Sequence, residues 1–214
     1  MKQRSRWQAA KDFATFPLRA LAIFNEDRWG LSSLRTDRFY YVGREVRGYC
    51  LDVGCCRYNV FINDFLNGNG KGIDCFPYEG LTEENLVDDL THFPFKEATF
   101  DSVSFIASWH HIPAAKRDIE LNEAYRVLRP GGNVIITSAS PLAGILAHIT
   151  VQWYDRLFRT RHNVDFERGM HDDEDYFVPD RETIERLRRA GFKEIRKKAF
   201  ATQWFLNALF TGTK

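Results

Sequence analysis

The stretch Val-Asp-Asp-Leu-Thr-His-Phe-Pro-Phe-Lys-Glu-Ala-Thr-Phe-Asp at residues 87–101 decides the fold, together with two segments that follow it. Ser-Trp-His-His stands at residues 108–111, and Tyr-Arg-Val-Leu-Arg-Pro-Gly-Gly-Asn-Val-Ile-Ile stands at residues 125–136. In chain order these segments predict an acidic turn, a buried strand, a helix ending in Arg-Pro-Gly-Gly and a second buried strand. This order is typical of the second half of a nucleotide-binding α/β sheet.

Around this stretch the pattern predicts helices first and then alternating strands and helices. Helical apolar spacing covers residues 7–24, 33–46 and 59–66. The helix before Arg-Pro-Gly-Gly carries Leu121, Ala124, Tyr125 and Leu128 on one face, and Pro130-Gly131-Gly132 is expected to stop it. Asp180 is expected to cap a further helix that runs to Ala190. The expected strands are 49–53, 72–74, 86–88, 101–107, 133–138, 194–201 and 203–211.

Composition excludes several classes of protein. The 214 residues, 44% of them hydrophobic, are enough for one globular domain with a substantial core. The net charge of +1 predicts no nucleic-acid partner, and no apolar run approaches the ~20 residues of a transmembrane segment. Without a Cys-x-x-Cys pair, the cysteines favour reduced thiols and a cytoplasmic location over a disulfide frame or a metal site. The four are Cys50, Cys55, Cys56 and Cys75.

The order of motifs over residues 49–138 resembles the class I S-adenosylmethionine (SAM) dependent methyltransferases, in particular the branch of quinone and small-molecule methylases. The resemblance implies a Rossmann-like, seven-stranded, mostly parallel sheet with helices on both faces and an antiparallel C-terminal strand pair. It implies SAM as the cofactor. The expected parts are an N-terminal helical cap (1–46), a SAM-binding core (47–140), a possible substrate lid (141–178) and a C-terminal helix with the strand pair (179–214).

The glycine loop departs from the family pattern. In the family, an acidic residue and Gly-x-Gly-x-Gly follow the first strand, because glycine lets the backbone approach the ligand. Asp52 and Gly54 match, whereas Cys56 and Tyr58 stand at the second and third glycine positions. Arg57 is a further candidate, to pair with the methionine carboxylate. The alternative is that this turn only packs and binds nothing.

Later motifs complete the predicted cofactor site. The resemblance assigns the ribose hydroxyls to Asp74, at the end of the second strand, and the adenine to Asp89 and the backbone of Leu90. Asp88, one residue away, competes with Asp89 for that role. The flanking residues Cys55, Cys75 and Ile106 belong to the same predicted set.

His110 and His111 follow the fourth predicted strand, at the sheet edge where the methyl group is expected. Imidazole has a suitable pKa to take a proton from an acceptor hydroxyl, so either histidine is a candidate base. The alternative is that a histidine here has no catalytic role.

The resemblance implies methyl transfer from SAM, and the aromatic content of 14% favours an apolar or amphipathic acceptor, a small molecule or a lipid-like one. No Asn/Asp-Pro-Pro-Tyr motif is present, which disfavours DNA adenine and protein glutamine as acceptors. A non-catalytic SAM-fold protein or partner subunit is the main alternative. A nicotinamide-dependent oxidoreductase is disfavoured, since Gly-x-Gly-x-x-Gly is absent. The oligomeric state is left open.

Overall fold

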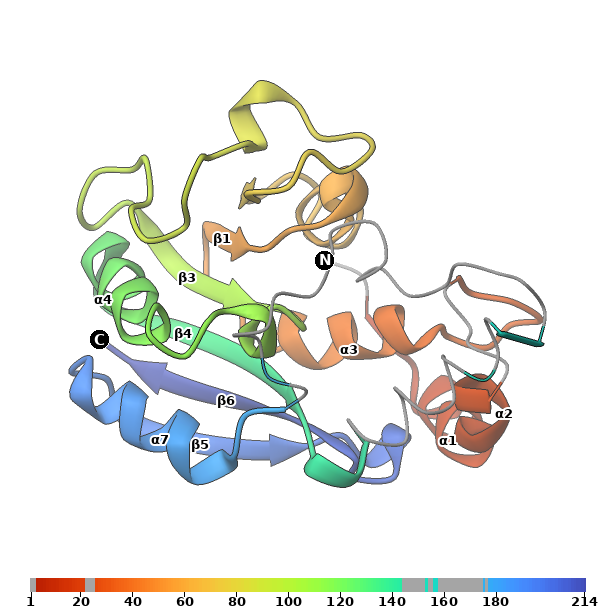
Figure 1. Cartoon of the computed structure of the whole chain (residues 1–214). Coiled ribbons are helices and arrows are strands. Elements are labelled where there is room, and N and C mark those ends of the chain that lie inside the picture. The colour runs from red at the N-terminus through yellow and green to blue at the C-terminus, as the bar shows by residue number, and fades with distance from the viewer. Residues whose placement is uncertain (1–2, 22–25, 144–152, 154–155, 158–174, 176) are drawn as a thin grey trace.

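The computed structural model describes residues 3–21, 26–143, 153, 156–157, 175 and 177–214. Within them, six strands form one sheet in the order β2-β1-β3-β4-β6-β5 (Figure 1). β1, β2, β3 and β4 pair in parallel, β6 is antiparallel to β4, and β5 is antiparallel to β6. This is the predicted α/β sheet with an antiparallel pair at its edge. The strands are β1 (Cys50–Val53), β2 (Gly70–Ile73), β3 (Phe100–Phe105), β4 (Leu128–Ala139), β5 (Lys193–Ala199) and β6 (Asn207–Thr213).

The strand predicted at 86–88 is reduced to a single parallel bridge between Asp74 and Leu86. The side chain of Asn85 donates to the carbonyl of Gly72 at 2.8 Å, so it takes an acceptor of β2 that a third strand would use. Pairing then ends, and the chain turns at Asp89. The described residues therefore hold six strands, not the seven that were predicted.

Helices cover both faces of the sheet, because buried side chains alternate along each strand. In β1, Leu51 joins the core cluster under α4 (Arg117–Val127) and α7 (Asp180–Arg189), whereas Cys50 joins the cluster under α3 (Leu34–Gly43). β4 and β6 divide their side chains in the same way. The prediction of helices on both faces is confirmed.

The helix predicted over residues 7–24 is interrupted. α1 (Arg6–Ala14) ends before α2 (Phe16–Leu21) begins. Pro17 has no backbone N–H, so it cannot bond to the carbonyl of Phe13 four residues earlier. That carbonyl instead accepts a hydrogen bond from the indole N–H of Trp204, at 2.9 Å. A contact with the far end of the chain thus replaces the missing helical bond.

Two other helix predictions were wrong in detail. Residues 59–66 form no regular α-helix, but a 3-10 turn (Arg57–Asn59) and a π-helical turn (Phe61–Phe65), because left-handed backbone in the first turn interrupts the helix. Asp180 is the first residue of α7 and makes no capping hydrogen bond. Its carboxylate pairs with Lys197 of β5.

The Arg-Pro-Gly-Gly segment lies within a strand and does not end the helix. α4 ends at Val127, and Leu128 already has extended backbone. Residues 129–132 then bulge out of the sheet opposite Asp101, with Gly131 at a φ of 80°. Proline and glycine therefore shape a β-bulge after the helix has ended.

The C-terminal strand pair is confirmed, with different bounds. The predicted runs were 194–201 and 203–211, but β6 begins only at Asn207. A 3-10 turn (Ala201–Gln203) and the residues after it occupy the connection, because Trp204 leaves the turn with left-handed backbone. The two strands therefore need a longer connection than was predicted.

A buried charge network joins the N-terminal helices to this connection. Asp37 of α3 accepts hydrogen bonds from Arg4, from Arg19 at 3.3 Å and from the hydroxyl of Thr202 at 2.7 Å. Arg19 also donates to the carbonyl of Thr202 at 2.9 Å, and Arg4 pairs with Asp12 at 3.4 Å. The four charged side chains are almost fully buried, so each charge depends on its partners.

Candidate cofactor site

The carboxyl ends of β1, β2 and β3 meet at one edge of the sheet, and hydrogen bonds connect the loops that leave them. After β1, the N–H groups of Gly54 and Cys55 both donate to the carbonyl of Ile73 in β2, at 2.8 and 3.1 Å. After β3, the hydroxyl of Ser108 donates to the carbonyl of Val53 at 2.8 Å. The three loops form one connected edge, where open α/β sheets bind their ligands.

The loop after β1 keeps left-handed backbone at every position of the Gly-x-Gly-x-Gly pattern. Gly54, Cys56 and Tyr58 have φ angles of 75°, 57° and 60°. Glycine is favoured in this region, and other residues adopt it at a cost of about 1–2 kcal/mol each. At Gly54 a side chain is also excluded, since an added Cβ would lie 2.6 Å from the Cβ of Ser108. The backbone shape of a glycine loop is therefore retained with only one glycine.

The ring of Tyr58 lies against the segment at 79–80. An added Cβ at Gly80 would stand 2.1 Å from the Tyr58 ring, so Gly80 makes room for it. The N–H of Tyr58 donates to the carbonyl of Glu79 at 2.9 Å. This packing explains how a large side chain is accommodated at the third glycine position.

Asp74 stands just after β2 and clamps the glycine loop. One carboxylate oxygen accepts the N–H of Cys56 at 2.9 Å, and the other accepts the N–H of Phe76 at 3.0 Å. The side chain is buried. A carboxylate has about four acceptor sites, so two bonds to the backbone are compatible with further hydrogen-bond donors.

Asp52 lies within β1 and is buried beside Asp74. The hydroxyl of Ser104 donates to it at 2.7 Å. Burial raises the pKa of Asp52 to about 7, although the Ser104 hydrogen bond acts in the opposite direction and the charge of Asp74 adds to the rise. Asp52 is thus a structural carboxyl that changes charge near neutral pH.

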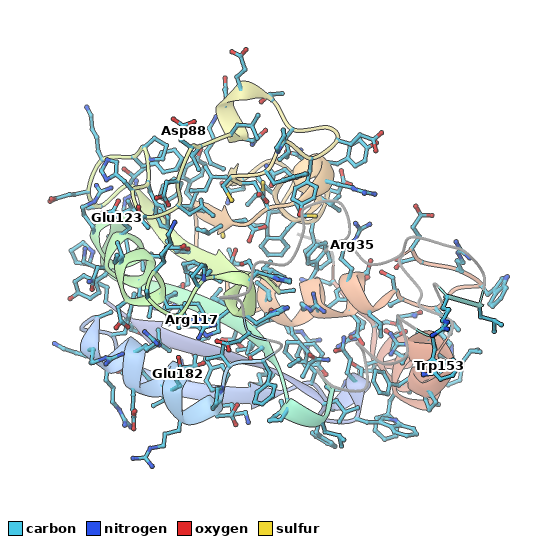
Figure 2. The ribbon with its side chains drawn as sticks, viewed as in Figure 1. Arg35, Asp88, Arg117, Glu123, Trp153 and Glu182 are labelled. Atoms are coloured by element: carbon cyan, nitrogen blue, oxygen red, sulfur yellow. The ribbon has the colours of Figure 1, made fainter. Side chains whose placement is uncertain are left out.

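Asp89 belongs to the long connection between β2 and β3. Its carboxylate accepts the N–H of Thr91 at 2.9 Å and lies 3.6 Å from the ammonium of Lys116. The Thr91 hydrogen bond lowers the pKa of Asp89. Leu90 packs against the core. Asp88, which competes with Asp89 for the adenine role, is exposed at the surface of the same segment (Figure 2).

Glu120 is a buried carboxyl near this segment that the sequence analysis missed. Burial raises its pKa to about 8, and the negative charge of Asp89 contributes. Its Oε2 atom has no hydrogen-bond partner within the described part of the chain. The helical pattern of α4 gives no signal for this burial, because a glutamate three residues into a helix is usually exposed.

The other predicted cofactor residues differ in burial. Cys55 is buried, Cys56 is half-buried and Cys75 is exposed. The side chain of Ile106 belongs to the core cluster under α3, on the opposite face from Leu51. Of the predicted positions, Cys56 is hydrogen-bonded to Asp74, whose charge also reaches Asp52, whereas Ile106 faces the core.

Positive charge from two arginines reaches the glycine loop. Burial raises the pKa of the Cys56 thiol, while the Arg57 backbone N–H and the charges of Arg57 and Arg35 lower it. Arg35 comes from α3 and is labelled in Figure 2. The sequence analysis considered Arg57 but missed Arg35, since nothing in the sequence places α3 beside this loop.

The two histidines lie on a 3-10 turn (Trp109–His111) directly after β3. His110 and His111 are half-buried, with ring centroids 3.9 Å apart. The carbonyl of His110 accepts the N–H of Asp175 at 3.1 Å. The predicted place of both histidines, at the carboxyl edge of the sheet, is confirmed.

The buried guanidinium of Arg117 packs against this turn. Arg117 at the start of α4 lies 5.9 Å from the ring of Trp109 and pairs with Asp175 at 2.6 Å and Glu182 at 3.1 Å. Figure 2 shows Arg117 and Glu182 between α4 and α7. The indole N–H of Trp109 donates to Thr183 at 3.1 Å. These contacts fix the histidine turn to α7.

A pocket of about 290 Å³ opens between α3 and the turn that follows the glycine loop. Acidic side chains and aromatic rings share its walls with a single arginine. Its lining residues are Glu26, Asp27, Arg35, Thr36, Phe39, Tyr40, Val60, Asp64 and Phe65. The pocket therefore lies between residues 26–40 of the N-terminal cap and residues 60–65 of the core.

Within the described ranges, no group of three His, Cys, Asp or Glu side chains is placed to hold a metal ion. No helix in this part of the chain has the length and apolar character to span a membrane. The substrate lid predicted at 141–178 lies mostly outside the described residues.

Residues 51–136 match the family model described as a methyltransferase domain. The match begins in β1 and ends in β4, so it contains the clamped glycine loop, Asp74, Asp89 and the histidine turn. Over this stretch, which is less than half of the chain, the protein is similar to a methyltransferase domain.

Solved structures with the same fold cover nearly the whole chain. One is a SAM-dependent methyltransferase from Thermotoga maritima, described as a possible histamine N-methyltransferase: 16% identity, 97% of this chain, 99% of that chain and a TM-score of 0.57. Another is 1,6-didemethyltoxoflavin-N1-methyltransferase from Burkholderia thailandensis with S-adenosylhomocysteine bound: 15% identity, 96% and 80% coverage, TM-score 0.54. The cyclase SpnF is as similar: 16% identity, 98% and 95% coverage, TM-score 0.56. At these identities the likeness shows the fold alone.

Proposed function

We propose that the protein is a SAM-dependent methyltransferase that transfers the methyl group of SAM to a small-molecule or lipid-like, amphipathic acceptor. The observation that carries the proposal is the left-handed loop at Gly54, Cys56 and Tyr58, held by the carboxylate of Asp74. Positive φ at non-glycine residues is strained and is kept most often where function needs that backbone. The proposed cofactor-binding set is Asp52, Gly54, Cys55, Cys56, Asp74, Cys75, Asp89, Leu90 and Ile106.

The residues of this set have different proposed roles. Asp74 accepts the ribose hydroxyls, while its carboxylate also holds the loop through the N–H groups of Cys56 and Phe76. Asp89 accepts from the adenine amino group. Arg35 and Arg57 supply the positive charge that a methionine carboxylate requires, since both already influence the loop.

When bound, SAM supplies a methyl group that its sulfonium has already activated. The chain then has to hold the acceptor in line and exclude water. His110 or His111, at the same edge, removes the proton of an acceptor hydroxyl.

The class of acceptor follows from the cap and the pocket beside the loop. Phe39, Tyr40 and Phe65 give the pocket aromatic walls, while Asp27 and Asp64 add negative charge. Aromatic walls with a few polar groups suit small amphipathic ligands. This supports an amphipathic acceptor over a highly anionic one.

The alternative is a non-catalytic member of the fold, and Cys56 and Tyr58 in place of glycine favour it. Incubation with SAM carrying a tritiated methyl group, together with fractionated small molecules and lipids, separates the two. Transfer of label to an organic-extractable product supports the proposal. SAM binding without transfer to any fraction, at protein concentrations where binding is saturated, favours the alternative.

A further inference from the structure

A group of large apolar side chains is exposed at the corner where α1 and α2 pack beside the connection between β5 and β6 (Figure 1). We call the exposed large apolar side chains of α1, α2 and this connection the aromatic surface: Phe13 and Trp204, whose ring centroids lie 6.4 Å apart, and also Phe205, Trp7 and Leu18. Their exposed fractions are 47%, 47%, 65%, 72% and 50% respectively. Exposed apolar patches of this kind usually mark an interaction site.

The exposure is built into the local structure. Trp204 and Phe205 have φ angles of 49° and 62°, a backbone region that bulky residues rarely adopt. The indole N–H of Trp204 donates to the carbonyl of Phe13, and its ring lies 5.7 Å from that of Phe16 in a tilted arrangement. The turn is therefore fixed in a shape that presents two aromatic side chains to solvent.

The charges around the aromatic surface are basic. Among the described ionisable residues of α1 and α2, Arg6 and Lys11 remain at the surface, while Asp12 and Arg19 are buried in the charge network. The connection at 200–207 contains no ionisable residue. Residues 1–46 hold nine Lys and Arg against five Asp and Glu, although the whole chain has a net charge of only +1.

We propose that the aromatic surface docks on an anionic lipid membrane. Trp and Phe side chains partition into the headgroup region, and nearby basic residues are attracted to anionic lipids. A second copy of the chain is a poorer partner, because a two-fold contact would bring the basic surfaces of both copies together. This inference goes beyond the proposed function and stands whether or not the methyl acceptor is a lipid.

Sedimentation with vesicles tests the proposal on the full chain without SAM. The protein should bind vesicles of phosphatidylcholine with about one third phosphatidylglycerol, bind pure phosphatidylcholine much less, and release at high salt. Phe205→Ser should weaken binding about fivefold, and Arg6→Glu with Lys11→Glu more than tenfold. Ile119→Ser is the matched control, since Ile119 is exposed to 47% on α4, away from this corner. It should bind as the unaltered protein does.

Absence of binding to the anionic vesicles would overturn the proposal, as would an equal loss in the control variant. Light scattering on the same proteins tests the alternative that a second copy of the chain binds the aromatic surface. If the unaltered protein does not bind vesicles and forms a dimer that Phe205→Ser dissociates, the aromatic surface is a contact between two copies of the chain. Thermal melts of each variant show whether a loss of binding is a loss of folding. Because SAM is absent throughout, failure here is distinct from failure of the proposed methyl transfer.

Discussion

The backbone N–H of Cys56 donates to the carboxylate of Asp74 across 2.9 Å, which ties the glycine loop to the end of the neighbouring strand. Cys56 stands where the family has its second glycine, and its backbone is left-handed all the same. Asp74 thus has a local role besides the ribose contact that the resemblance implies. A substituted glycine loop can keep its shape when a buried carboxylate holds it.

Removing this clamp should weaken cofactor binding. Asp74→Ala loses both the loop contact and the proposed ribose acceptor, and we expect a cost of about 1.5–3 kcal/mol in SAM affinity by calorimetry. Asp88→Ala is the matched control, because this exposed carboxylate lies in the same long connection. Unchanged affinity in Asp74→Ala, or a larger loss in the control, would show that the site has been assigned to the wrong residues.

Cys56→Gly should preserve SAM affinity and stabilise the protein modestly. Glycine adopts left-handed backbone without the cost of about 1–2 kcal/mol that a side chain adds. The greater freedom of glycine in the unfolded chain partly offsets this gain in stability. Cys56→Phe should abolish SAM binding while the fold survives, because the added ring competes with ligand volume. If Cys56→Phe instead unfolds and Cys56→Gly melts at a lower temperature, the thiol packs in the core and the loop reading is wrong.

Asp52 should make stability depend on pH. Its folded pKa of about 7 lies above the ordinary value, so its contribution to stability is present at low pH and is lost as pH rises towards 7. Asp52→Asn has no carboxyl to ionise, so it does not undergo this loss. Its free energy of unfolding should exceed that of the unaltered protein by more at about pH 8 than at about pH 5, and by at most about 4 kcal/mol. Urea unfolding at pH 5 and at pH 8 measures the difference. Asp101→Asn is the control: the Tyr49 N–H lowers the pKa of Asp101, so no such gain is expected.

The charge network under the cap should be costly to break. Asp37→Ala leaves Arg4 and Arg19 buried without their shared carboxylate, and we expect a loss of about 3–5 kcal/mol in the free energy of unfolding. Asp64→Ala is the control, because this carboxylate is exposed and lies outside the network. It should change the free energy of unfolding by less than about 0.5 kcal/mol. Equal, small effects in both variants would mean that the network carries no net stabilisation.

The sequence predicted the central elements because their signals are local. The apolar run at 101–107 became β3, and Leu121 and Ala124 are buried as the helical spacing indicated, whereas Leu128 is buried in β4. The glycine-loop residues and Asp74 also meet as predicted, since the carboxyl ends of parallel strands share one edge.

The sequence analysis missed contacts that a distant residue completes. Pro17 breaks the helix between α1 and α2, and Trp204 takes the carbonyl that Pro17 cannot use. Arg117 pairs with Asp175 and Glu182, about sixty positions further along the chain, so no local pattern announces it. Such long-range polar contacts are invisible to periodicity.

Calorimetric titration of the purified protein with SAM, S-adenosylhomocysteine and NAD tests the central claim most directly, namely that the substituted loop still forms a SAM site. The account predicts binding of SAM and S-adenosylhomocysteine with dissociation constants in the micromolar range, on the order of metabolite sites in general, and no binding of NAD. No heat of binding with SAM at millimolar concentration, in a protein that melts cooperatively, would contradict it.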